Sequence, residues 1–121
     1  MKYVYPAVFH CAVEGGYYID FPDVEGAITQ ADTLYEALEM AEDALTGTLV
    51  CWEDFKAGNF IDPDGNKLDM KNRIVEPTPI DQVKAEPDEY STSAFVTLIK
   101  ADTDAYRKML AEKVPASKGA A

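Results

Sequence analysis

The chain has 121 residues, the size of one domain with a modest hydrophobic core. Its apolar fraction of 47% is normal for a folded protein. Its apolar runs are too short to cross a bilayer, and its first residues lack the features of a secretory signal. We therefore expect one domain over residues 1–114, a disordered tail over 115–121 and a cytoplasmic location.

The net charge of −11 is distributed unevenly along the chain. Residues 1–57 carry eleven acidic and two basic side chains, a net charge of −9, whereas residues 58–121 carry eleven and nine, a net charge of −2. A strongly acidic half repels nucleic acid phosphates, attracts basic partners and speeds their encounter. A solvated surface without a partner has the same charge pattern, so charge alone leaves both explanations open.

Two strands joined by a tight turn are predicted at the N-terminus. Aromatic and branched residues over 3–11 favour a strand. Pro6 has no N–H to donate, so we expect this strand to lie at a sheet edge or to begin near Pro6. Gly15 and Gly16 supply the positive φ angles of a hairpin. Over residues 17–21 the side chains alternate between two faces, as in a half-buried strand.

A third short strand over 27–30 precedes the clearest predicted helix. Thr33 and Glu36 have the spacing of a capping box, in which each side chain satisfies a free backbone N–H at the helix start. The apolar stripe expected to face the core consists of Leu34, Leu38, Ala41, Leu45, Leu49 and Trp52. Glu39 and Asp43 share a face away from this stripe, which is either solvated, holds a cation or receives a basic partner.

The second half of the chain contains fewer regular elements. Residues 58–92 are rich in turn signals and are predicted to form one long irregular loop. A strand over 94–100 follows, and then a short helix that is capped by Asp102 or Thr103 and reaches Lys113. The predicted order is β-β-β-α-β-α, an α+β domain with helices on one face of a mostly antiparallel sheet.

No catalytic residue, metal site or cofactor is predicted. His10 is the single histidine, and its neighbour Cys11 points to the opposite face of the strand, which disfavours a nucleophilic triad or a zinc site. Cys11 and Cys51 are expected to be reduced and buried. The turn over 62–66 lacks the ligand spacing of a calcium-binding loop.

The first 45 residues contain short motifs in a fixed order. These motifs are YPAVF (5–9), EGGY (14–17), FPD (21–23), Gly26, TQ (29–30), DT (32–33) and EALEMAEDAL (36–45). Together they resemble the HicB-like antitoxins of bacterial toxin–antitoxin systems. A weaker likeness covers residues 95–99 and 104–108.

The resemblance implies a partial ribonuclease-H-like fold and a partner, a small basic HicA-type toxin that degrades RNA. It also implies that the toxin is neutralised by being covered, without chemistry, and that the antitoxin forms a homo-oligomer. Related antitoxins continue into a C-terminal DNA-binding segment, whereas this chain ends at Ala121, so we expect no direct nucleic acid binding. True ribonuclease H enzymes hold metals with carboxylates on strands, and the predicted strands over 3–11 and 95–100 contain none, so we expect no enzyme.

Partner binding is expected from exposed acidic and aromatic side chains of the second strand and the turn after it. These residues are Tyr18, Asp20, Asp23 and Glu25. The main alternative is an orphan HicB-like interaction module, which self-associates and has a different partner or none. A weak enzyme or metal-binding protein that uses clustered carboxylates is the third hypothesis.

Overall fold

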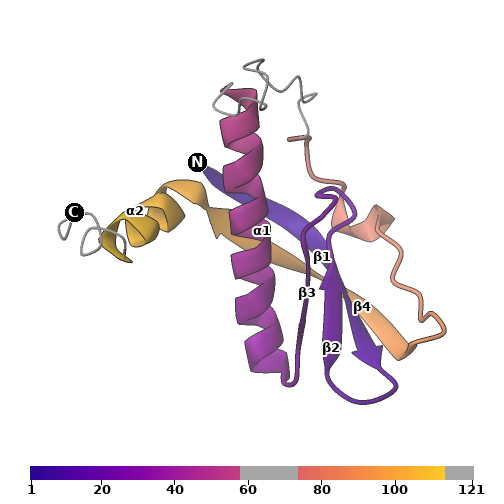
Figure 1. Ribbon diagram of the computed structural model, residues 1–121. Coiled ribbons are helices and arrows are strands. Elements are labelled where there is room, and N and C mark those ends of the chain that lie inside the picture. Colours follow the sequence, from indigo (N-terminus) through magenta and orange to yellow (C-terminus); the bar gives the residue numbers. More distant parts are fainter. Residues whose placement is uncertain (58–73, 114–121) are drawn as a thin grey trace, which may run out of the picture.

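The structure is a computed structural model that describes residues 1–57 and 74–113 (Figure 1). Its elements are β1 (Lys2–Ala12), β2 (Tyr17–Asp20), β3 (Ile28–Ala31), α1 (Leu34–Lys56), a short 3₁₀ helix η1 (Ile80–Gln82), β4 (Ser91–Asp102) and α2 (Thr103–Lys113). This order confirms the predicted α+β class and adds η1. The expected tail at 115–121 and the part of the predicted loop at 58–73 lie outside the described residues.

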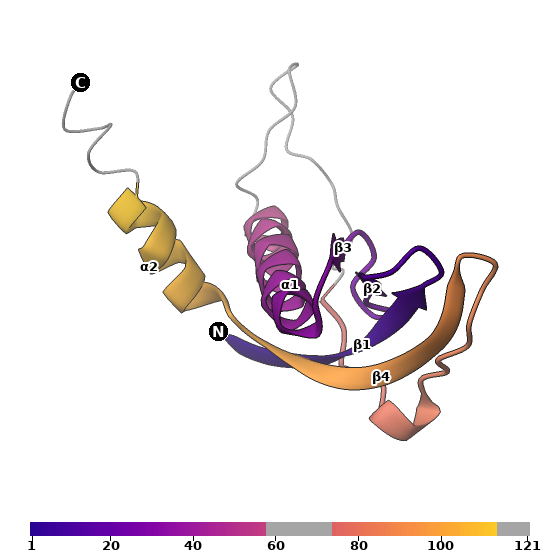
Figure 2. The ribbon, with the colours of Figure 1, turned by 90° about the horizontal axis from the view of Figure 1, so that it is seen from below.

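The four strands form one antiparallel sheet in the order β3-β2-β1-β4. Helix α1 lies across one face of the sheet, and α2 continues from the end of β4 beside α1 (Figures 1 and 2). The buried layer between helix and sheet consists of Tyr5, Ala7, Phe9, Ile19, Phe21, Val24, Ala27, Ala37, Ala41, Leu45, Leu49, Ile99 and Ala101. Removing this apolar layer from water is the main force that holds α1 against the sheet.

Strand β1 lies in the middle of the sheet and begins at Lys2, so neither predicted alternative, an edge strand or a strand that begins near Pro6, is correct. It pairs with β4 along its whole length, but with β2 only from Val8 to Cys11. Pro6 therefore precedes the stretch that has neighbours on both sides, and its missing N–H removes no hydrogen bond to β2. At Pro6, the side of β1 that faces β2 further along the strand is not paired with it.

The predicted hairpin between β1 and β2 is confirmed. Gly15 and Gly16 have φ angles of 96° and 78°, and the turn is closed by hydrogen bonds of 3.0 Å from Ala12 N to Gly16 O and from Gly15 N to Ala12 O. A Cβ atom on Gly16 would stand 2.9 Å from Ala31 O. Gly16 is therefore required both by the turn and by the close approach of β3.

Helix α1 begins as predicted, but its buried face differs at its N-terminal end. Thr33 Oγ1 accepts a hydrogen bond of 3.1 Å from the backbone N–H of Glu36. Leu34 and Leu38, expected in the core, are 45% and 43% exposed, and the fully buried Ala37 and Ala41 face the core there. Small side chains let the helix lie close to the sheet, and they contribute little to a hydrophobic periodicity.

Residues 74–90, which we call the strap, form the described part of the predicted loop. Two acidic side chains hold it to the sheet. Asp23 accepts hydrogen bonds from Thr78 N at 2.8 Å and Thr78 Oγ1 at 2.6 Å, and Asp88 accepts one from the Tyr18 hydroxyl. Figure 2 shows η1, which belongs to the strap, on the opposite side of the sheet from α1.

The strap explains why the sheet is buried on both faces of β1. Val8 and His10 alternate with the core residues of β1 and so point away from α1, yet they are only 4% and 8% exposed. The strap ends earlier than the predicted loop, because β4 begins at Ser91 and not at residue 94. Pairing of β4 with the full length of β1 accounts for the additional strand residues.

The C-terminal helix follows β4 directly. Asp102 Oδ1 accepts a hydrogen bond of 3.1 Å from Ala105 N, so the cap is the first of the two predicted candidates. Of the two free cysteines, Cys11 is half-buried and Cys51 is exposed, so the predicted burial is wrong for Cys51. Neither α1 nor α2, nor any other helix of the described residues, is long and apolar enough to cross a membrane.

Candidate protein-binding surface

The four residues predicted to bind a partner lie away from α1, on β2 and in the turn after it. Tyr18 and Asp20 lie together around His10: the Tyr18 and His10 rings stack with centroids 4.4 Å apart, and Asp20 Oδ2 lies 3.2 Å from His10 Nε2. Asp23 holds the strap, and Glu25 is exposed in the β2–β3 turn. The role of all four in partner binding stays a prediction.

The end of the strap is fixed by one carboxylate. Asp88 Oδ1 accepts hydrogen bonds from the Tyr18 hydroxyl, from Tyr90 N at 2.8 Å and from Ser91 Oγ at 3.2 Å. The first two bonds lower the pKa of Asp88, while desolvation and the bond to Asp88 raise the pKa of Tyr18. The backbone of Tyr90 also accepts a hydrogen bond of 2.9 Å from Val13 N, so strap and hairpin are joined at this point.

A hollow of about 710 Å³, the hairpin hollow, lies where the β1–β2 hairpin, the end of β3, the start of α1 and the end of the strap meet. Its aromatic residues are Tyr17, Tyr18 and Tyr90, and its acidic residues are Glu14, Asp32, Glu36 and Glu89. None of the described residues that line it is basic. Of the four predicted binding residues, only Tyr18 belongs to this lining.

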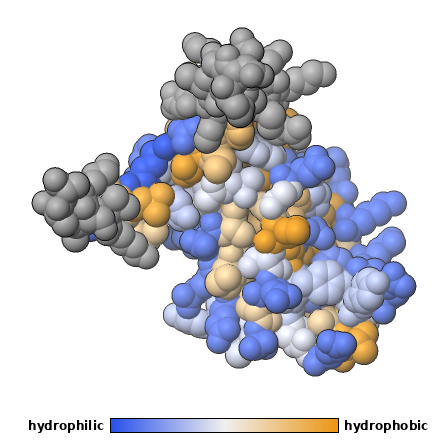
Figure 3. All heavy atoms as spheres, viewed as in Figure 1, coloured by the Kyte–Doolittle hydropathy of each residue, from blue (hydrophilic) through white to orange (hydrophobic). Residues whose placement is uncertain are grey.

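A second hollow of about 520 Å³, the interhelical groove, lies between α1 and α2. Its larger apolar residues are Met40, Tyr106 and Met109, and its acidic residues are Glu39, Glu42, Asp43 and Asp102. Met40 also lines the hairpin hollow, so the two hollows adjoin. In the view of Figure 3, hydrophilic residues cover much of the α1 side of the molecule, and hydrophobic residues are visible on α2.

The close packing of α2 on α1 depends on a glycine in the middle of α1. A Cβ atom on Gly47 would stand 3.3 Å from the hydroxyl oxygen of Tyr106, so the absence of a side chain makes room for the tyrosine ring. Tyr106 in turn lines the interhelical groove. A residue that lowers helix propensity therefore shapes the proposed binding surface.

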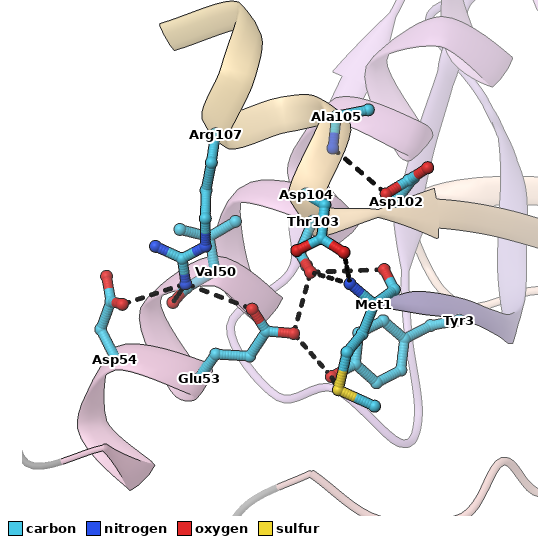
Figure 4. A network of polar contacts seen from close by, with 10 residues as sticks. All are labelled: Met1, Tyr3, Val50, Glu53, Asp54, Asp102, Thr103, Asp104, Ala105 and Arg107. Carbon is cyan, nitrogen blue, oxygen red and sulfur yellow. Dashed lines mark hydrogen bonds and ion pairs between the residues drawn. The ribbon is translucent and has the colours of Figure 1, made fainter. Parts of the chain in front are cut away.

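A polar network holds the start of α2 against the end of α1 (Figure 4). Glu53 accepts hydrogen bonds from the Tyr3 hydroxyl at 2.7 Å, Thr103 Oγ1 at 2.9 Å and Arg107 at 3.2 Å, and Arg107 lies 3.0 Å from Asp54. Burial raises the pKa of Glu53, but the hydrogen bonds outweigh burial, so its pKa lies below the ordinary value. The network fixes one helix relative to the other.

The two hollows are chemically suited to cationic side chains. Carboxylates bind guanidinium and ammonium groups, tyrosine faces attract them, and thioethers adapt to irregular apolar surfaces. Within residues 1–57 and 74–113, no three His, Cys, Asp or Glu side chains are placed to hold a metal ion. The arrangement therefore fits a basic protein surface.

Part of this surface was accessible to prediction from sequence. The acids of α1 recur at positions 36, 39 and 43, and this spacing predicted an acidic helix face. Apart from Tyr18, the aromatic and methionine side chains were not predicted, because they come from β2, α1, α2 and the strap and meet only in the folded chain.

Comparison with known proteins gives relatives of one kind. No family model matches the chain. Antitoxin HicB 1 of Photorhabdus laumondii is 56% identical over 41 residues, which are 34% of this chain and 26% of that protein. Antitoxin HicB of Escherichia coli K12 is 35% identical over 72 residues, which are 60% of this chain and 50% of that protein.

Among solved structures, the chain resembles a chain of a toxin–antitoxin complex from Streptococcus pneumoniae, with a TM-score of 0.59 over 88% of this chain and 73% of that one. At 20% identity, this likeness concerns the fold. The matched stretches span half or less of the two curated antitoxins. The resemblance to the HicB-like antitoxins is confirmed as a similarity over these matched stretches.

Proposed function

We propose that this chain is a cytoplasmic, antitoxin-like protein that binds and covers a small basic HicA-type toxin that cleaves RNA. The observation that carries the proposal is the pair of adjoining acidic hollows, on a chain whose relatives are antitoxins. Covering a toxin makes and breaks no covalent bond, so the proposal assigns no catalytic residue and no cofactor. The partial ribonuclease-H-like fold, which the resemblance to HicB-like antitoxins implies, is part of the same proposal.

The charges of the surface support a basic protein partner. Each hollow is lined by four acidic side chains and, among the described residues, by no basic one. Such a field speeds encounter with a positively charged protein and repels phosphate backbones, so direct nucleic acid binding is not proposed. Tyr18, which lines the hairpin hollow, is the member of the predicted set that this surface includes.

The test is the association rate of the chain with the product of a short basic reading frame beside its gene. We compare the double variant E36Q/E39Q, on the surface, with D81N/E86Q, which removes the same charge from exposed positions of the strap. In low salt, the surface variant is expected to associate about tenfold more slowly, with a weaker salt dependence, because long-range attraction sets the rate. Equal rates for both variants and the unaltered chain contradict the proposal.

The second candidate is an orphan HicB-like module that self-associates, and β4 favours it. In the described part of the chain, β4 pairs with β1 alone, and residues 91–99 of this edge strand carry no charge. Phe95 and Leu98 on this strand are 38% and 51% exposed. Long uncharged edges are templates for pairing with another chain.

Sedimentation velocity decides whether this edge joins two copies. The expected result is a concentration-dependent dimer that L98K shifts toward monomer, because a lysine at an edge opposes pairing. A chain that stays monomeric over the whole concentration range contradicts the homo-oligomer.

A further inference from the structure

We infer that the interhelical groove receives the apolar face of a basic amphipathic helix of the partner protein. The inference rests on the proposed function and adds to it the site and the kind of segment that is bound. It concerns only the groove between α1 and α2 and makes no use of the hairpin hollow.

The groove presents apolar side chains that are accessible in the isolated chain. Met40 on α1 and Met109 on α2 are 42% and 38% exposed and line the same groove with Tyr106. Methionine side chains are flexible and polarizable, and they adapt to the side chains of an inserted helix. The two exposed methionines therefore face the same groove from two helices, and a bound partner would cover them.

The rim of the groove determines the charge of the occupant. Glu39, Glu42 and Asp43 are exposed on α1, and their carboxylates make no hydrogen bond or ion pair with another described residue. Asp102 lies at the α2 side of the same groove. An occupant with lysine or arginine beside its apolar face satisfies these carboxylates, whereas an acidic occupant is repelled.

The position of the groove favours a helix over an extended peptide. It lies between two helices, and with the exception of Asp102, the last residue of β4, its lining residues come from α1 and α2. An extended segment gains affinity by adding to a sheet edge, which the groove does not offer, whereas an amphipathic helix binds by inserting apolar side chains into a groove.

The groove is also formed before a partner arrives. Gly47 admits Tyr106, and the Glu53 network holds the start of α2 against α1. A preformed groove loses less conformational entropy on binding than one that must first assemble.

Adjacent residues of α2 provide a matched pair of variants for the test. Met109 and Leu110 are 38% and 39% exposed, but only Met109 lines the groove. We expect M109S to weaken binding of the neighbouring-gene toxin about tenfold, because it truncates an apolar contact in the groove, and L110S to change it less than about twofold. Circular dichroism and thermal unfolding of both variants control for the fold.

The second measurement locates the bound segment directly. The chain is labelled with ¹³C in its methionine methyl groups and titrated with toxin, and separately with a short helical peptide of leucine and lysine. The methyl signals of Met40 and Met109 are expected to shift, while that of Met1, which does not line the groove, stays in place. The same peptide with glutamate in place of lysine is expected to cause no shift.

The outcomes separate the groove from the function as a whole. If M109S and L110S bind the toxin equally and the Met40 and Met109 signals do not move, the inference that a helix binds in the groove is wrong. The antitoxin proposal is then unaffected. If the unaltered chain does not bind the toxin, the antitoxin proposal fails. The titration with the leucine–lysine peptide then tests whether the groove binds a basic amphipathic helix. Shifts at both methionines support it, and their absence refutes it.

Discussion

Glu53 connects three elements of the fold, and its substitution tests how the two helices are held together. Its carboxylate accepts hydrogen bonds from Tyr3 on β1 and from Thr103 and Arg107 on α2. The Glu53 side chain is 17% exposed, and Thr103 is fully buried. Replacing Glu53 by alanine removes the shared acceptor and leaves a cavity in its place.

The size of the effect follows from the hydrogen bonds that Glu53 accepts. Hydrogen bonds to a charged acceptor contribute roughly 1.5–3 kcal/mol each, and without Glu53 the buried Thr103 hydroxyl donates only the longer bond of 3.3 Å to Met1 O. Contributions within one network are not additive, and the half-exposed Arg107 adds little. We therefore expect E53A to lower the free energy of unfolding by about 3 kcal/mol, and E53Q by about half as much, since the amide oxygen still accepts.

The pH dependence of this effect has a defined sign. The pKa of Glu53 is lower in the folded chain than its ordinary value, about 4.3 for a glutamate in an unfolded chain. The contribution of the carboxylate is therefore complete above about pH 4.3 and is lost as the pH falls through the folded pKa. The difference between the unaltered chain and E53Q is expected to be largest near pH 7 and to shrink toward pH 3.

Urea unfolding at several pH values measures these quantities. A loss of about 3 kcal/mol shifts the midpoint by about 1.5 M if the unfolding slope is about 2 kcal/mol per molar urea. E39Q, an exposed acid of the same helix, is the control and is expected to change the stability by less than about 0.5 kcal/mol. A loss in E53A no larger than in E39Q, or a deficit in E53Q that grows as the pH falls, refutes the role given to the network.

Three further substitutions test local features of the fold. G16A is expected to destabilise the chain by about 2 kcal/mol more than G15A in urea unfolding, since both residues have positive φ but only a Cβ on Gly16 meets Ala31 O, at 2.9 Å. D23N, which weakens the acceptor for the strap, is expected to speed proteolytic cleavage within residues 74–90 while α1 stays protected. G47A is expected to stabilise the chain by about 1 kcal/mol only when combined with Y106F, because the added Cβ then meets no hydroxyl oxygen.

The parts of the fold that were predicted correctly depend on local physics. Paired glycines mark the hairpin because few other residues adopt positive φ. Thr33 caps α1 because its hydroxyl oxygen reaches the N–H of a residue three positions later. Such signals lie within a few residues of one another, so the sequence displays them completely.

The predictions that failed depend on neighbours that are distant in the sequence. Pro6 indicated an open edge, but β2 joins β1 only two residues later. Leu34 and Leu38 are exposed where a core position was expected, and Ala37, which the predicted stripe lacked, is buried there and allows the helix to approach the sheet. The strap could not be predicted because its fixed points, such as the contact of Asp23 with residue 78, join residues 55 positions apart.

The acidic residues around His10 and the strap differ from those on α1 that line the interhelical groove, and this difference limits what the net charge can mean. Opposite α1, Asp20, Asp23 and Asp88 each bind another residue of the chain. On the α1 side, the carboxylates of Glu39, Glu42 and Asp43 lie beside the exposed methionines of the interhelical groove and make no hydrogen bond or ion pair with another described residue.

Solubility alone explains exposed acids but gives no reason to surround apolar side chains with them, since an exposed methionine works against solubility. A surface that combines both is expected of a binding site for a basic, partly apolar partner. Complex formation should therefore slow in high salt, because salt screens the acidic side chains. It should still depend on Met109, because salt does not screen apolar contacts.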